Sequence, residues 1–292
     1  MELLTLKVTP LSHFGTLPKG DTIFGQILAY LFLNKDTIFE NYLNEEPKLI
    51  VSDMMPYGYV YRPNLPLNCF RENSKHEIDK KDIRKKEFIS LENLQSGNLH
   101  LCEKVDFSDE FVNVKNSINR ITFTTDGSDF APYGVDEKVF FKNLWIFLLV
   151  ETSIKDKILS IMEQIGKYGF GKDGNLGKGN FDIELITSPI KSFDSEFVMS
   201  ISPVILKDQN ITHSWYEPFT RFGKYGLNNA HTNAFKKPVL MTNSAAVVKL
   251  KKYKNYFGSC LDNGIENKPS FLQGYSISVP FAIKDKSCLS TN

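Results

Sequence analysis

A single glycine-rich stretch constrains this chain more than any other feature. Residues 165–181 read IGKYGFGKDGNLGKGNF and hold six of the chain's 18 glycines. Without a Cβ, a glycine lets the backbone approach a ligand closely and adopt positive φ, so that consecutive N–H groups can line an anion site. The interleaved lysines would supply the countercharge. The candidate anion-binding residues of this stretch are Lys167, Gly169, Gly171, Lys172, Gly174, Gly177, Lys178 and Gly179.

The surroundings of this stretch exclude two common phosphate motifs. Residues 169–174 spell G-x-G-x-x-G, but a dinucleotide fingerprint follows a strand and opens a helix. Here apolar residues at helical spacing precede the stretch from 154 to 165, and residues 181–186 alternate as a strand. A P-loop needs Ser or Thr after its Gly-Lys pair, and this chain has glycine there. The alternatives that remain are an anion site and a surface loop without a ligand.

Composition predicts a soluble globular protein with one large or two modest domains. The chain has 292 residues, 41% of them hydrophobic, which is ample for a core. Lys plus Arg number 35 against 34 Asp plus Glu, so nucleic-acid binding would have to use local patches. Only five of the basic residues are arginines, which makes an arginine more informative than a lysine. Neither a membrane span nor an export signal is indicated, so we expect a cytoplasmic protein.

The cysteines give no metal or disulfide signature. Cys69, Cys102, Cys260 and Cys288 form no C-x-x-C pair and have no histidine at metal-ligand spacing. We therefore expect four free thiols in a reducing cytoplasm, no metal site and no cofactor.

The order of the elements predicts an α+β fold. Up to residue 188 the pattern indicates strands at 3–8, 49–51, 57–61, 112–133, 139–150 and 181–186, helices starting at 21, 36 and 154, and a mixed-charge insertion at 71–87. This order is close to the split βαβ pattern of a ferredoxin-like sheet. After Pro189 strands are expected at 197–201, 238–242, 245–250 and 275–283, with no long amphipathic helix. The predicted domains are therefore 1–188 and 189–292.

Two helix starts carry capping signals. Asp21 is predicted as the N-cap of the first long helix, and Ser153 with Asp156 as a capping box for the helix before the glycines. The segment Lys19, Gly20, Asp21 and Thr22 is a candidate phosphate seat, because a helix N-terminus presents unpaired N–H groups and the positive dipole end. Since an Asp21 cap would compete with a phosphate for these groups, Thr22 and the backbone are expected to bind it.

Three motifs in sequence order resemble the RAMP superfamily of CRISPR proteins. They are LPKGDTIFG at 17–25, NSINRIT at 116–122 and the glycine-rich stretch, and FLQGYSISVPF at 271–281 extends the resemblance over most of the chain. Within that superfamily the chain is most similar to the subunit that caps the 5′ handle of the guide RNA in type III-A (Csm) effector complexes. The resemblance implies two ferredoxin-like (RRM-like) domains with β-hairpin or thumb insertions, and a subunit that binds RNA without cleaving it.

The resemblance also implies where the RNA lies and which proteins are partners. Residues 19–22 and 167–179 would contact the guide RNA. Asn119 and Arg120 fall in the segment that leads into the RNA-contacting thumb, with Asn119 in place of an acidic residue. The planar fork of Arg120 suits a phosphate or a guanine edge. The implied partners are the large polymerase-like signalling subunit and the repeated RAMP backbone subunit.

Two other functions remain open. His13 is a candidate RNA contact, but related repeat-processing ribonucleases need no metal and often use an early histidine as general acid or base. Their glycine loop lies near the chain's end, whereas more than 100 residues follow Gly179 here. A purely structural assembly subunit would fit the near-neutral charge.

Overall fold

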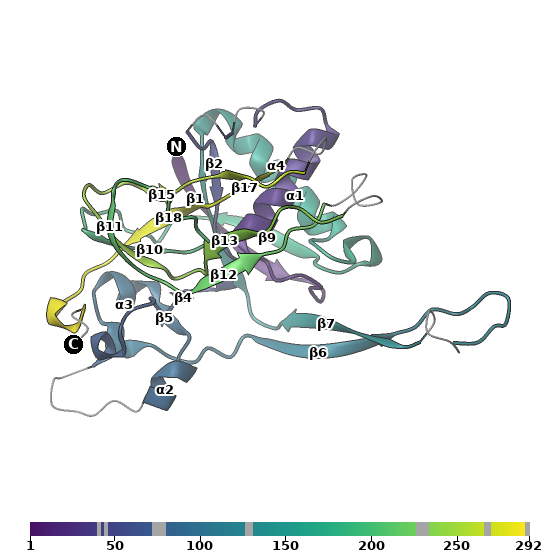
Figure 1. Ribbon diagram of the computed structural model, residues 1–292, viewed down its shortest axis with the longest axis horizontal. Helices are drawn as coiled ribbons and strands as arrows, with labels where there is room; N and C mark the ends of the chain where they lie inside the picture. The colour runs from purple at the N-terminus through teal and green to yellow at the C-terminus, as the bar shows by residue number, and fades with distance from the viewer. Residues whose placement is uncertain are drawn as a thin grey trace.

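The fold combines helices with several antiparallel sheets, which confirms the predicted α+β class (Figure 1). The computed structural model describes residues 1–39, 42–43, 46–71, 80–125, 131–225, 234–265 and 270–289. None of the helices within these ranges has the length and apolar character needed to cross a bilayer.

The first sheet contains the N-terminal strand at its centre. Its strands are β1 (Glu2–Pro10), β2 (Leu49–Val51), β3 (Met55–Pro56), β8 (Leu144–Val150) and β9 (Phe181–Ile186). Their order is β2-β8-β1-β9, with β3 also paired to β8, and all pairings are antiparallel. Helices α1 (Gly20–Leu33) and α4 (Lys155–Tyr168) pack on one face of this sheet.

Strand β8 explains how the core is divided. All seven of its residues are buried, as the continuous apolar run predicts for a central strand. Because successive side chains point to opposite faces, Leu144, Ile146, Leu148 and Val150 join the core under α1 and α4. Trp145, Phe147 and Leu149 point to the other face, where they meet the second sheet.

The second sheet packs against this other face. Its strands are β10 (Phe197–Ser200), β11 (Ile211–Trp215), β14 (Val247–Leu250), β15 (Tyr256–Gly258) and β18 (Tyr275–Pro280), in the order β11-β14-β10-β18-β15. Met199, Val247 and Val279 share one apolar cluster with the β8 residues. The molecule is thus layered as helices, first sheet and second sheet, with no α-helix among the described residues after α4.

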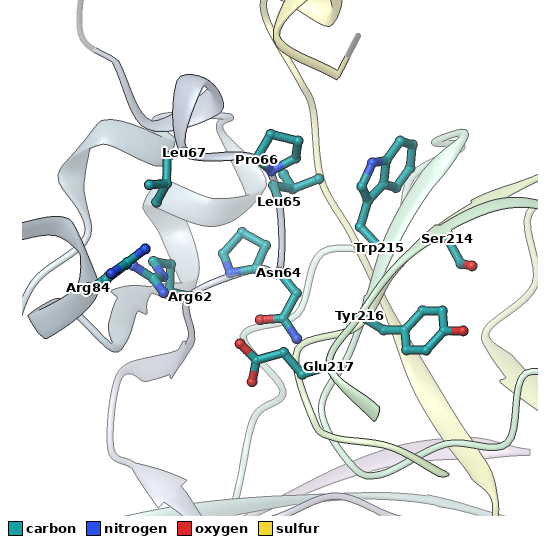
Figure 2. Close-up of a pocket in the computed structure, with 11 residues that line it drawn as sticks. Arg62, Asn64, Leu65, Pro66, Leu67, Arg84, Ser214, Trp215, Tyr216 and Glu217 are labelled. Carbon is teal, nitrogen blue, oxygen red and sulfur yellow. The ribbon is translucent and has the colours of Figure 1, made fainter. Parts of the chain in front are cut away.

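Shorter elements surround these layers, and one of them forms an arm. The pairs are β4 (Tyr59–Tyr61) with β5 (Phe88–Ser90), β6 (Ser108–Lys115) with β7 (Tyr133–Phe140), β12 (Pro218–Arg221) with β13 (Val239–Thr242), and β16 (Leu261–Asp262) with β17 (Phe271–Leu272). Short helices are α2 (Lys80–Lys85) and α3 (Leu91–Gln95), and 3-10 turns are η1 (Leu67–Phe70), η2 (Leu99–Leu101), η3 (Thr152–Ile154), η4 (Gly174–Leu176) and η6 (Lys286–Leu289). The β6–β7 hairpin extends well away from the body (Figure 1). An open pocket of about 670 Å³ is lined by residues 62–67, by Arg84 of α2 and by residues 214–217 (Figure 2).

Several local predictions were wrong for identifiable reasons. The described part of 36–43 is not helical but a set of turns after α1. No capping box starts α4, because the Ser153 hydroxyl donates to Glu151 and Ile154 is the N-cap. Arg120 does not lie within a strand, since β6 ends at Lys115 and the chain turns there. For Ser153, the nearby Glu151 carboxylate replaced the expected cap.

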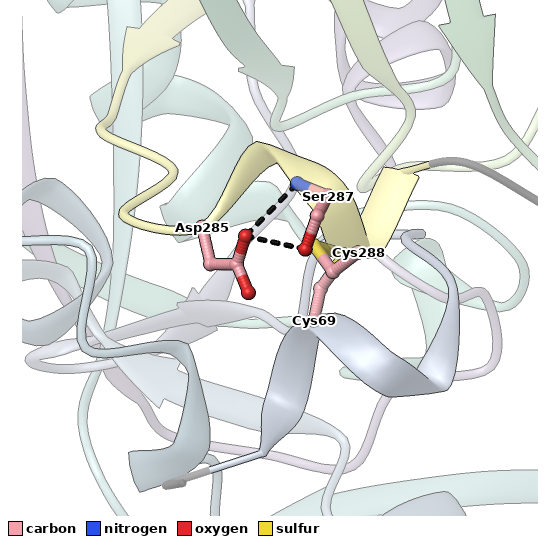
Figure 3. The surroundings of a disulfide bond; sticks show 4 residues. All are labelled: Cys69, Asp285, Ser287 and Cys288. Carbon is pink, nitrogen blue, oxygen red and sulfur yellow. Dashed lines mark hydrogen bonds between the residues drawn. A yellow bond between two sulfur atoms is a disulfide. The ribbon is translucent and has the colours of Figure 1, made fainter. Parts of the chain in front are cut away.

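The prediction of four free thiols was also wrong. Cys69 in η1 and Cys288 in η6 form a disulfide across 219 residues (Figure 3). The Asp285 carboxylate accepts hydrogen bonds from the Ser287 N–H and hydroxyl at 2.9 and 2.6 Å, and so supports the turn that carries Cys288. Only the tertiary fold brings the two cysteines together, so their spacing in sequence carries no signal. Cys102 is free, and burial raises the pKa of its thiol to about 12.

Candidate functional site

The glycine-rich stretch folds into a compact loop between α4 and β9. Gly169, Gly171, Gly177 and Gly179 all have positive φ, from 68° to 98°. A Cβ on Gly169 would lie 2.4 Å from the Lys178 carbonyl oxygen, and one on Gly179 would lie 2.3 Å from the Phe170 carbonyl oxygen. Gly169 and Gly179 are therefore required by close backbone packing inside the loop as well as by its φ angles.

Most of the loop's N–H groups are already donated within the protein. The N–H of Gly171 donates to the Gln26 side chain at 2.9 Å, that of Lys172 to the Thr16 hydroxyl at 2.9 Å, and that of Gly179 to the His13 carbonyl at 2.7 Å. These acceptors belong to α1 and to the segment after β1. The expected row of free N–H groups is thus absent at these three positions, because the loop uses them to dock on its neighbours.

Lys178 and His13 converge on one buried carboxylate in the middle of the arm's paired strands. The Glu137 side chain on β7 is 1% exposed; Lys178 Nζ forms an ion pair with it, and His13 Nδ1 lies 3.5 Å from its Oε2. Asn113 on β6 donates to the same carboxylate at 3.0 Å. The Lys178 hydrogen bond holds the pKa of Glu137 below its ordinary value, although burial opposes this.

Asp173 makes a second link between loop and arm. Its carboxylate accepts from Lys115 Nζ at 2.6 Å, which is the main reason that the pKa of Asp173 is lowered. Lys178 Nζ lies 3.5 Å from the same group. Glu137, within β7, and Asp173, which pairs with the last residue of β6, therefore fix the paired strands of the β6–β7 arm to the glycine loop, and Lys178 serves this connection.

The outer surface of the loop keeps cations and apolar side chains exposed. Lys167 and Lys172 are exposed, and within the described part of the chain neither forms an ion pair. Tyr168 is 68% exposed and Leu176 is 67% exposed. A cation beside an exposed aromatic ring is the combination that single-stranded nucleic acids use for phosphate contact and base stacking.

The N-terminus of α1, the second predicted anion-binding site, is occupied by a carboxylate of the protein, that of Asp53. Asp53, which follows β2 and is fully buried, accepts from the Gly20 N–H at 2.7 Å and from Lys19 Nζ at 2.8 Å. The hydroxyls of Tyr61 and Ser244 donate to the same carboxylate at 2.9 and 2.6 Å. Burial alone would lower the pKa of Lys19, but Asp53 and Tyr61 raise it above its ordinary value. Sequence reasoning missed Asp53, which no motif or periodicity marks.

Asp21 is not the N-cap of α1, and this prediction was wrong. The helix starts at Gly20 with Lys19 as the capping residue, and Asp21 forms a bidentate ion pair with Arg221 on β12, at 2.6 and 2.8 Å. Burial raises the pKa of Asp21, although Arg221 opposes the shift. Thr22 directs its hydroxyl to the Lys19 carbonyl oxygen at 2.7 Å. The helix mouth therefore connects the two halves of the chain.

Asn119 and Arg120 lie beyond the paired strands of the arm. The Asn119 side-chain oxygen accepts from the Ile121 N–H at 2.9 Å and so stabilises the turn. Arg120 is exposed, and Ile121 and Phe123 are 89% and 82% exposed. The structure thus brings His13, the glycine loop and the paired strands of the arm together, and presents Arg120 with exposed apolar neighbours beyond the end of these strands.

The comparisons with known proteins give a match in fold. No protein-family model and no curated protein sequence matches the chain. A chain of the crystal structure of the Csm1-Csm4 cassette in complex with pppApA superposes with a TM-score of 0.63 at 14% identity, covering 97% of this chain and 99% of that one. A chain of the Csm3-Csm4 subcomplex in the type III-A CRISPR-Cas interference complex gives 0.58 at 15% identity, covering 92% and 98%.

These likenesses define the fold over nearly the whole length. The chain has the fold of a subunit of type III-A CRISPR-Cas complexes. Csm4 is the component that both assemblies contain, and the fold is Csm4-like.

Proposed function

We propose that this chain is a non-catalytic RNA-binding subunit of a type III-A CRISPR complex, which caps the 5′ handle of the guide RNA and anchors the large signalling subunit. The observation that carries the proposal is the fold match over 97% of the chain to the Csm1-Csm4 cassette. The motifs at 17–25, 116–122 and 165–181 support it independently. The partners would be the counterparts of Csm1 and Csm3, in the roles of signalling and repeated backbone subunits.

We also propose that the two sheets are the cores of two ferredoxin-like domains. Such a domain places its first strand between its third and fourth, with the second strand outside the third. The order β2-β8-β1-β9 has this form, with α1 and α4 as the two helices. The order β11-β14-β10-β18 repeats it in the second half, with β15 added at the edge.

The RNA would lie along the outer surface of the glycine loop. Lys167 and Lys172 supply phosphate contacts there, and Tyr168 supplies a stacking surface. Lys178, Lys19 and Asp21 would act indirectly, because their charges are held by Glu137, Asp53 and Arg221. Arg120 would reach a different stretch of the RNA from the end of the arm.

Absence of cleavage is part of the proposal, and His13 is the residue that tests it. Its ring is half-exposed, lies edge-on to Phe111 at 4.8 Å and faces the buried Glu137 carboxylate, which fits a role in holding the arm. The purified protein should leave repeat RNA intact with or without divalent metal. Specific cleavage that is lost in His13→Ala would favour the processing-ribonuclease alternative.

The decisive experiment is to sequence the RNA that co-purifies with the assembled complex. Small RNAs that share one short 5′ tag are the expected result, and a complex that forms without RNA would leave only the structural-subunit alternative. In binding assays, Lys167→Ala with Lys172→Ala should reduce the log–log salt slope by about 1.4, at roughly 0.7 per phosphate contact. The control is Lys251→Ala with Lys254→Ala, which removes the same charge from an exposed segment of the second half.

A further inference from the structure

The pocket beside β11 is a candidate binding site that no motif indicated. It is an open pocket with a volume of about 670 Å³, lined by residues 62–67, Arg84 of α2, and residues 214–217 (Figure 2). We propose that it binds one nucleotide, with the phosphate on the arginine side and the base against the aromatic side. This inference deepens the proposed function by adding a second nucleotide contact remote from the glycine loop.

The walls of the pocket are held in place before any ligand arrives. The Asn64 N–H donates to the Ala245 carbonyl at 2.9 Å, and the Arg62 N–H donates to the Glu87 carbonyl at 2.8 Å. Pro63 and Pro66 restrict the loop between these anchors. Just beyond it, Cys69 is fixed by its disulfide to Cys288. A preformed concave site of this size falls in the usual range for small-ligand pockets.

Two arginines lie on one side of the pocket. In a chain with 30 lysines and five arginines, the meeting of Arg62 and Arg84 at one site is informative. The Arg62 guanidinium packs over the Phe70 ring at 5.5 Å and donates to the Ile83 carbonyl, which positions the turn that carries Arg84. The Arg84 side chain is exposed, and its planar fork suits the oxygens of a phosphate.

The opposite side offers aromatic rings. Trp215 is half-buried against Phe197 and His213, so its indole is held firmly, and Tyr216 is 46% exposed beside it. Rings fixed in this way form a stacking surface for a base, worth about 1–3 kcal/mol per base. A phosphate-binding side and a stacking side in one pocket match the two ends of a nucleotide better than they match a peptide carboxylate.

The polar side chains between these sides suggest a base preference. Asn64 and Glu217 both line the pocket, and Figure 2 draws their side chains next to each other. A carboxylate accepts hydrogen bonds from the exocyclic amino groups of adenine, cytosine and guanine, whereas uracil has none. Glu217 would repel a phosphate, which places the phosphate near Arg84 and the base near Glu217. We therefore expect amino-bearing bases to bind about tenfold more tightly than uracil.

The ligand is either a free nucleotide or one nucleotide of single-stranded RNA. Tryptophan fluorescence of the full-length protein can distinguish these two sources. Trp145 is 3% exposed and donates to the Tyr59 carbonyl, so quenching by a stacked base reports on Trp215. Titration with CMP, GMP and UMP tests the free nucleotide, and a single-stranded oligonucleotide tests RNA. Saturable quenching by either supports the pocket, and Trp215→Phe should remove the signal.

Matched variants test the assignment of each side. Arg84→Gln should weaken binding about tenfold, while Lys85→Gln on the same helix, with the same loss of charge outside the pocket, should change it less than twofold. Glu217→Gln should reduce the preference for cytosine over uracil. Urea unfolding of each variant checks that the fold is intact.

Three results would overturn the proposal. The first is that no nucleotide or oligonucleotide quenches the fluorescence saturably. The second is that Arg84→Gln and Lys85→Gln weaken nucleotide binding equally. The third is that Arg84→Gln abolishes binding of a partner protein while nucleotide binding is unchanged. The last would identify the pocket as a protein interface. Each leaves the proposed function standing if tagged guide RNA still co-purifies, so the two proposals fail separately.

Discussion

Replacing Asp53 with Asn should unfold this protein far more readily than replacing any exposed carboxylate. The Asp53 carboxylate is fully buried and accepts from Lys19, Gly20, Tyr61 and Ser244 at 2.6–2.9 Å. An Asn side chain keeps one acceptor oxygen and turns a donor toward groups that are themselves donors. It also leaves the Lys19 ammonium without its countercharge.

The magnitude follows from the burial of the pair. Removing one partner of a buried ion pair costs about 3–5 kcal/mol, because an uncompensated charge remains inside. This is a large fraction of the about 5–15 kcal/mol that stabilises a typical protein. For comparison, the exposed pair of Lys7 and Glu184, at 3.3 Å, should contribute less than about 1 kcal/mol.

Urea unfolding of Asp53→Asn, Lys19→Met and the double variant measures the coupling between the two groups. Lys7→Met is the control. We expect the double variant to be more stable than the sum of the single losses predicts, since it removes both charges. A loss below 1 kcal/mol for Asp53→Asn would refute this reasoning. So would a Lys19→Met variant of normal stability that binds RNA poorly, because Lys19 would then be a phosphate contact.

Three further predictions test the loop, the arm and the disulfide. Because the pKa of Glu137 is lowered in the folded state, its carboxylate stabilises the protein fully above its ordinary pKa and progressively less as pH falls through the folded value. The gap in urea midpoint between wild type and Glu137→Gln should therefore narrow from about pH 5 downward. Gly171→Val should cost at least about 2 kcal/mol in thermal unfolding, since its Cβ would lie 2.5 Å from a side-chain carbon at φ 73°, whereas Gly177→Asn, in open space at φ 82°, should cost less than about 1 kcal/mol. Cys69→Ser should cost about 2–5 kcal/mol, and a reductant should lower wild-type stability to the same level while leaving the variant unchanged.

Periodicity predicted most of the secondary structure that forms the layers, but it missed β11 and β15 of the second sheet. The apolar run ending at Val150, the helix before the glycines and the alternating strand at 181–186 each fold as expected, because burial pattern and element type agree there. The short stretch at 36–43 and the capping residue Asp21 did not, because a tertiary partner or a turn replaced the local signal. The pairing of distant strands and of Cys69 with Cys288 has no local signature at all.

In the candidate site, too, the local backbone features could be predicted from the sequence and the tertiary partners could not. The glycines were identified correctly as positions of unusual backbone, and their positive φ angles follow from that chemistry. Their N–H groups were assigned to a ligand, but Gln26, Thr16 and His13 accept several of them, and nothing in the sequence places those residues beside the loop. Bulky substitution at Gly171 therefore tests folding and cannot by itself test binding.

Both anion seats suggested by the sequence hold carboxylates of the protein itself. Asp53 occupies the mouth of α1, and Glu137 holds Lys178, so cations that looked available for a ligand stabilise the frame instead. This internal pairing is consistent with a net charge of +1. Under the proposed function, RNA would meet cations that remain exposed, among them Lys167 and Lys172 on the outer loop and Arg120 beyond the paired strands of the arm. If only these residues contact phosphates, at about −0.7 in salt slope per contact, the chain would bind single-stranded RNA weakly on its own, and the assembled partners would supply the remaining affinity.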